Sequence, residues 1–285
     1  MRRRAVLRVA LDLVVLVAVA GLLVAVHELL PAATQTQLAF DHGAPRPLTL
    51  VTAAYVHADD AHLLGNLLGY GTMTAVTYLV TSHLGRRRWF WWTSLCLFLL
   101  VPVLVNLANY AVLLTWFPGL TPTNRGFSGV VASFGGFLFV AAAVFVGDEY
   151  GRSVGVYVGE AAGLLVLALV TARASGTVSV LSAGLVVIGL VAAVFGVRLE
   201  LKRGGVSAAA DRPRRRVLAD ALFAGSLFAL VGILVYGLVP TTVVVDGRLT
   251  NVFAHAVGFA FGVVLALATA ALDGRVGADA GWPRR

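Results

Sequence analysis

A serine flanked by glycines is the residue of this chain whose setting best suits chemistry. Ser128 stands in Arg125-Gly126-Phe127-Ser128-Gly129, just inside a long apolar stretch, where a backbone or a small molecule can approach its hydroxyl closely. His255 lies about one helical turn inside the last apolar stretch. A serine hydroxyl is a weak nucleophile until an adjacent base takes its proton, and histidine is the commonest base. Together these two residues have the chemistry to attack a carbonyl carbon.

A second pair of polar residues could stabilise the product of that attack. His62 and Asn66 are spaced i, i+4, which places them on one face of a helix. Negative charge develops on the attacked carbonyl oxygen, and hydrogen-bond donors already aimed at it contribute a few kcal/mol each. His62, Asn66 and the backbone N–H of Ser128 are donors of this kind. No aspartate or glutamate lies near His255 in its own stretch, so the sequence favours a Ser-His dyad over a triad.

The composition is that of a membrane protein. Of the 285 residues, 59% are hydrophobic and only 13% are charged, and the mean hydropathy is +0.89. A soluble domain could not cover so large a core with so little polar surface. The formal charge of +8 does not indicate nucleic-acid binding, because the arginines cluster beside apolar stretches and not among aromatic residues.

Two features of residue usage narrow the class further. The single cysteine, Cys96, lies in an apolar stretch, which excludes an internal disulfide and a cysteine-based metal cluster. As a separate expectation, we predict no metal site and no cofactor. Arginine strongly outnumbers lysine, which occurs only as Lys202, and alanine, valine and glycine abound. This usage indicates a GC-rich prokaryotic genome, with archaea among the candidate sources.

Eight stretches are apolar over the roughly 20 residues needed to cross a hydrocarbon core of about 30 Å. They are residues 5–27, 62–82, 89–115, 127–146, 154–172, 178–198, 217–239 and 251–272. The connections leave little room for a soluble domain, so residues 1–285 are expected to form one all-α transmembrane domain. The long connection 28–61 mixes prolines with apolar residues. It is predicted to be a loop partly embedded in the outer leaflet, with its backbone groups bonded to protein.

Positive charge orients these spans, because lysine and arginine remain on the cytoplasmic side of a membrane. If the N-terminal arginines lie inside, the arginines that fall outside are Arg46, Arg125, Arg173 and Arg248. The rest of the 22 lysines and arginines then lie inside. The asymmetry predicts a multi-pass protein of the cell membrane with eight spans and both termini cytoplasmic.

That topology places the four candidate residues at one depth. Ser128 begins its span at the outer end, and His255 lies about one turn inside the outer end of the last span. His62 and Asn66 occupy the outer end of the second span. With about 1.5 Å of rise per residue, all four lie within several ångströms of one plane below the outer face. An ionisable side chain inside a span is costly, and its presence there is by default a functional-site hypothesis.

The order and spacing of these residues resemble the rhomboid family of intramembrane serine proteases. The matching elements are His62-x-x-x-Asn66 on the second span, Gly126-x-Ser128-Gly129 at the head of the fourth, and Ala254-His255-x-x-Gly258-x-x-x-Gly262 on the last. His57 also precedes His62, as another histidine does in many relatives. The embedded loop 28–61 agrees with the pattern of that family.

The resemblance implies a rhomboid-like helical bundle and a serine endopeptidase that uses no cofactor. Ser128 would be the nucleophile, His255 the general base, and His62 and Asn66 the oxyanion donors. The glycines of the two later motifs would bring the last helix against the fourth. The implied partners are the lipid bilayer and membrane-protein substrates, cleaved in or near their transmembrane segments.

The chain also departs from the family pattern. Three apolar stretches separate the Ser128 and His255 spans where the six-helix core has one, so two helices are extra. Many active relatives carry a tyrosine four residues after the serine, and this chain has Ala132. The family's Trp-Arg pair in the first loop is absent, and Pro45-Arg46-Pro47 stands near that place.

Other readings therefore remain open. A serine between glycines is most often a helix-packing device, and an inactive rhomboid-like protein that binds transmembrane clients is the main alternative. A small-solute transporter would require a polar site near mid-membrane and repeated halves, which the sequence does not suggest. Glu160, inside the span 154–172, is a lone intramembrane carboxylate to which the sequence assigns no partner.

Overall fold

Long helices make up most of the computed structural model of this chain, which describes residues 2–116, 119, 122–202, 212–239, 244–245, 248–249 and 252–279. These helices are α1 (Arg2–Leu29), α4 (Asp60–His83), α5 (Arg87–Trp116), α6 (Ser128–Tyr150), α7 (Arg152–Ser175), α8 (Val180–Lys202), α10 (Arg214–Leu238) and α11 (Val252–Asp279). All eight are long and apolar enough to cross a membrane, and their bounds lie within four residues of the predicted spans, except that α11 ends seven residues later. The predicted all-α, multi-pass architecture is thus confirmed.

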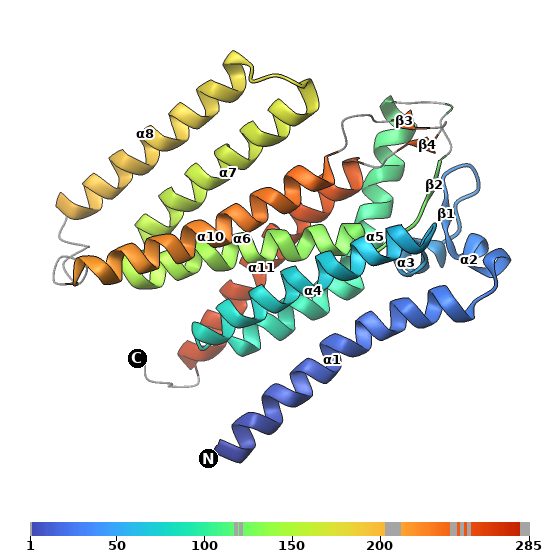
Figure 1. The fold of residues 1–285 in the computed structure, drawn as a ribbon, viewed down its shortest axis with the longest axis horizontal. Coiled ribbons are helices and arrows are strands. Elements are labelled where there is room, and N and C mark those ends of the chain that lie inside the picture. Colours follow the sequence, from blue (N-terminus) through green and yellow to red (C-terminus); the bar gives the residue numbers. More distant parts are fainter. Residues whose placement is uncertain are drawn as a thin grey trace.

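Helix α6 is the centre of the bundle. It is apolar on all sides, and a helix of that kind must be covered on all sides by protein or lipid. It packs against α4, α5, α7, α10 and α11 and is buried along most of its length, whereas fewer than half of the residues in each other long helix are buried. Helix α1 and the α7–α8 pair flank the bundle, and α8 packs chiefly on α7 (Figure 1).

The two ends of the bundle hold different parts of the chain. One end holds the start of α6 and of α11 together with the short strands, and we call it the dyad end (Figure 1). The opposite, terminal end holds the start of α1 and the end of α11, as eight crossings require. Ser128, His255 and His62 each lie within the first turn of their helices, at the dyad end. The structure therefore brings these three residues to the same end of the bundle.

The connection 28–61 is built of short elements at the dyad end. They are α2 (Ala32–Leu38), β1 (Phe40–Asp41), α3 (Thr49–Thr52) and the 3₁₀ turn Ala53–Tyr55. Strand β1 pairs antiparallel with β2 (Thr123–Asn124), the short segment before the Ser128 loop. Asn106 of α5 donates to the Leu50 carbonyl at 2.9 Å and accepts from the Asn124 amide at 2.6 Å. The Asn106 side chain thus satisfies a backbone carbonyl of this connection and ties it to the segment before Ser128.

A second short ribbon precedes α11 at the dyad end. Strand β3 (Val244–Val245) pairs antiparallel with β4 (Arg248–Leu249), in the connection from α10 to α11.

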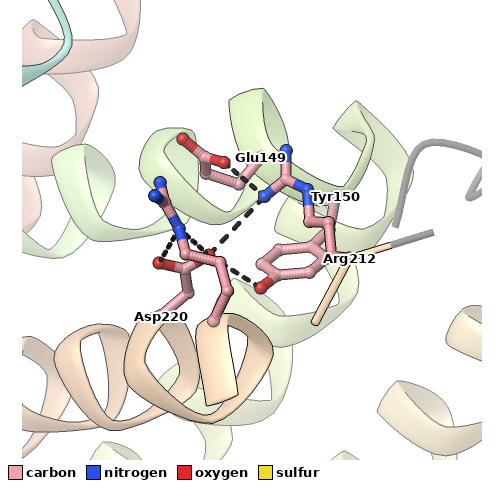
Figure 2. A network of polar contacts seen from close by, with 5 residues as sticks. Glu149, Tyr150, Arg212 and Asp220 are labelled. Carbon is pink, nitrogen blue, oxygen red and sulfur yellow. Dashed lines mark hydrogen bonds and ion pairs between the residues drawn. The ribbon is translucent and has the colours of Figure 1, made fainter. Parts of the chain in front are cut away.

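Ion pairs at the terminal end tie α10 to the end of α6 (Figure 2). Arg212 donates to the Glu149 carboxylate at 2.5 Å, and its guanidinium lies 5.3 Å from the centre of the Tyr150 ring. The Tyr150 hydroxyl donates to Asp220 at 2.9 Å. Asp220 also pairs with Arg216 at 3.2 Å, one turn earlier on α10. These contacts fix where α10 begins, and its far end reaches the candidate site.

Candidate functional site

Ser128 and His255 form a hydrogen-bonded pair between α6 and α11. The Oγ of Ser128 lies 2.9 Å from the Nε2 of His255, although the two residues are 127 positions apart in the chain. The Nδ1 of His255 lies 2.9 Å from the carbonyl oxygen of Leu238, the last residue of α10. A carbonyl oxygen only accepts, so Nδ1 carries the proton and Nε2 accepts the Ser128 O–H. This is the tautomer that a general base requires.

Close contact between two helix backbones makes this meeting possible. A methyl group built on Gly258 would lie 2.3 Å from the Gly129 carbonyl oxygen, and one on Gly262 would lie 2.0 Å from the Ser133 carbonyl oxygen. On the facing helix, a methyl group on Gly136 would lie 2.2 Å from the Phe259 carbonyl oxygen. Small residues let helix backbones approach closely inside membranes. The interhelical distance that puts His255 on Ser128 therefore depends on these glycines.

The turn before Ser128 is held by the 28–61 connection. Gly126 has a φ of +116°, a backbone conformation that residues with a side chain rarely adopt. Its N–H donates to the Ala53 carbonyl at 2.9 Å. The next N–H, that of Phe127, points to the Nε2 of His57 at 3.4 Å. Ser128 is the first residue of α6, so its own N–H has no partner within the helix and adjoins the positive end of the helix dipole.

His62 and Asn66 flank this turn from α4. The Asp59 carboxylate caps α4 by accepting the His62 N–H at 2.8 Å, which orients the first helical turn. A methyl group built on Gly126 would lie 2.6 Å from His62 Nε2 and 3.5 Å from Asn66 Nδ2. The Asn66 Nδ2 is buried and has no hydrogen-bond partner within the described part of the chain. A donor aimed beside the Ser128 turn is thus left free for an incoming acceptor.

Two cavities adjoin the dyad on different sides. One, of about 20 Å³, lies against Ser128 between α5 and the 3₁₀ turn, and Ala53, Pro102 and Asn124 are among its lining residues. That volume suits about one water molecule. The other, of about 260 Å³, reaches His255 between α7, α10 and α11 and is otherwise lined by apolar residues and glycine.

One group of the site, the carbonyl group of Leu238, was not predicted from the sequence. The last carbonyls of any helix lack intrahelical partners, so the end of α10 was a candidate acceptor. Which polar group it would meet was not visible in the sequence. Ala132, the position where many rhomboid proteases carry a tyrosine, is fully buried and offers the imidazole no hydrogen bond. In this chain the bond to Leu238 orients the ring instead.

The described residues contain no group of three or more histidine, cysteine or acidic side chains placed to bind a metal ion. Comparison with protein-family models, with curated proteins and with solved structures finds no match for this chain.

His57 should make the stability of the dyad end depend on pH. Burial, with smaller contributions from the neighbouring His62 and His27, lowers the pKa of His57 from 6.5 to about 4. Between these values the unfolded chain binds more protons, so the free energy of unfolding falls as pH drops from about 6.5 to about 4, by on the order of 3 kcal/mol. Thermal unfolding in detergent, at neutral pH and near pH 4, measures this loss.

The variant His57→Asn should lose less stability on acidification than the wild type. The part of the pH dependence that comes from other groups, such as the buried His42, should remain. An equal loss in both proteins would show that His57 does not titrate in the folded state as expected.

Proposed function

We propose that this chain is a rhomboid-type intramembrane serine protease, which hydrolyses peptide bonds in or near the membrane-spanning segments of other proteins. The observation that carries the proposal is the 2.9 Å contact between Ser128 and His255, with the proton of the imidazole held on the Leu238 side. An accepting nitrogen on the serine hydroxyl is the arrangement that activates this nucleophile.

The proposed reaction has two halves. In the first, Ser128 Oγ bonds to the carbonyl carbon while His255 Nε2 takes the hydroxyl proton and passes it to the leaving amine as the peptide bond breaks. In the second, water attacks the acyl-serine, His255 takes the proton of that water, and Ser128 regains its own. Asn66, His62 and the Ser128 N–H would bind the oxyanion in both halves.

The proposed function also implies an orientation in the membrane and a role for each helix. The charge distribution would place the dyad end near the outer face and both termini in the cytoplasm of a prokaryotic cell. Helix α10 would take the place of the fifth helix of the six-helix rhomboid core, since its last carbonyl orients His255 and it packs on α6. Helices α7 and α8 would be the two extra helices.

A catalytically silent protein that binds transmembrane clients is the second candidate. The observation that favours it is Ala132, which gives the imidazole no stacking ring. The Leu238 contact offsets this loss, because it holds the ring and its tautomer by a hydrogen bond.

Labelling of the detergent-folded protein by a fluorophosphonate distinguishes the two candidates. The wild type should be labelled covalently, and Ser128→Ala should not be labelled. A rhomboid protease already known to react in the same detergent serves as the positive control. An unlabelled wild type beside a labelled control would favour the silent candidate, and labelling that survives Ser128→Ala would assign the nucleophile to another residue.

Loss of the Asn66 amide should slow this labelling by about 10²- to 10³-fold, the usual effect of removing one oxyanion donor. Both Asn66→Ala and the nearly isosteric Asn66→Asp lack the donor, so both should show the loss, measured as the second-order rate constant. Thr74→Val is the matched control. Thr74 lies on α4 two turns after Asn66, and its hydroxyl is also buried without a hydrogen-bond partner in the described part of the chain. If Thr74→Val lowered the labelling rate constant as much as the Asn66 variants, the loss would come from disturbed packing of α4 and not from a missing oxyanion donor.

A further inference from the structure

Glu160 is a carboxylate inside a membrane span, and its side chain is exposed on the surface of α7. Within the described part of the chain it has no ion pair or hydrogen bond. It lies eight residues from the start of α7, or about 12 Å along the helix axis. The hydrocarbon core is about 30 Å thick, so this depth is well inside it. Such residues are costly there and usually face a polar partner.

Two carboxylates that are buried between the helices have such partners. Asp12 of α1 accepts hydrogen bonds from Arg87 at 2.5 Å and from the Tyr78 hydroxyl at 2.7 Å. Asp220 of α10 pairs with two arginines and a tyrosine hydroxyl at the terminal end. The fold therefore supplies a basic group where an acidic one is buried between its own helices. Glu160 is instead exposed on the surface of α7, where another molecule can reach it.

The surface around Glu160 leads toward the candidate site. At 100° per residue, Val156, Gly163 and Leu167 share one face of α7 with Glu160, and Val156 and Leu167 are strongly exposed. Gly163 and Leu167 also line the 260 Å³ cavity that reaches His255. Leu167 lies about 10 Å along the helix axis from Glu160, toward the dyad end. A helix lying along this face would meet the carboxylate and the cavity together.

We propose that this face of α7 binds a membrane-spanning helix that carries a lysine or arginine at the depth of Glu160, and that such helices belong to the substrates of the Ser128 site. The assignment to substrates rests on the proposed function. A basic group inside the hydrocarbon core needs a counterion as much as Glu160 does, so each removes the cost of burying the other. The neighbouring apolar residues and Gly163 allow close packing of the two helices.

The test is a photo-crosslinking assay in liposomes with the Ser128→Ala protein, which keeps the α7 surface and cannot cleave the probe. The probe is a synthetic single-span peptide of leucine and alanine with one lysine about 12 Å from the end of its apolar stretch and a photoreactive leucine beside it. We expect crosslinks to residues 156–167. Replacing the peptide lysine by norleucine, or the protein residue by Glu160→Gln, should lower the yield about ten-fold, which corresponds to 1.4 kcal/mol.

The strictest test exchanges the charges of residue 160 and of the peptide. Glu160→Lys should lose the lysine peptide and capture a peptide with glutamate in its place, whereas the control Glu28→Gln, at the exposed end of α1, should leave the yield unchanged. Equal capture of the lysine and norleucine peptides, capture elsewhere on the chain, or failure of the charge exchange would overturn the proposal. Crosslinks between two copies of the chain that compete with the peptide would assign Glu160 to self-association and overturn it as well. Because binding is read without cleavage, these results are independent of whether Ser128 reacts.

Discussion

Replacing His255 by alanine should slow the reaction of Ser128 with a fluorophosphonate by roughly 10⁴-fold or more, the scale at which removal of the base disables a serine-histidine pair. The structure gives the reason, because Nε2 of His255 is 2.9 Å from the serine oxygen. Without an acceptor there, the hydroxyl keeps its proton and stays a weak nucleophile. The rate constant of labelling, followed over hours at high probe concentration, measures the change.

Two controls separate this effect from misfolding. His83→Ala removes an exposed histidine from the other end of α4 and should be labelled at the wild-type rate. The thermal midpoint of His255→Ala should fall only modestly, since the substitution removes the hydrogen bonds to Ser128 and Leu238 but creates no clash. A His255→Ala protein that folds and is labelled within ten-fold of the wild-type rate would contradict the assignment of His255 as base.

The variant Gly262→Ala should damage both stability and reactivity without touching the dyad. Its added methyl group would lie 2.0 Å from the Ser133 carbonyl oxygen, which belongs to helix backbone and cannot rotate away. Overpacking of this kind costs about 1–3 kcal/mol and occasionally more. Separating α11 from α6 also moves His255 from Ser128, and misplacement by about 1 Å can lower a rate by about 10²-fold.

Thermal unfolding and labelling of the same Gly262→Ala sample test both expectations. Gly71→Ala is the matched control, because Gly71 also lies within a long helix and a methyl group there meets nothing within 4 Å. That variant should be as stable as the wild type or slightly more stable, since alanine favours helix over glycine. If the two variants behaved alike, contact between the α6 and α11 backbones would not control the position of the dyad.

The sequence alone determined the spans and the depth of the polar residues. Length and hydropathy are local properties, so eight apolar stretches predict eight helices. Successive spans cross the membrane in opposite directions and basic residues stay inside, so the sequence also predicts which helix ends lie together. Position within a span then fixes depth, which is why Ser128, His255, His62 and Asn66 could be assigned to one end before any fold was known. The types of these residues supplied the proposed chemistry.

Only the tertiary structure decided which groups touch. Depth along a helix leaves its rotation and its neighbours free, and both are set by packing between segments far apart in the chain. The 2.9 Å Ser128–His255 contact depends on α6 and α11 meeting at Gly258 and Gly262, and the hydrogen bond from His255 depends on where α10 ends, at Leu238. For the same reason the sequence could show that Glu160 is intramembrane, but only packing could leave it facing outward without a partner among the described residues.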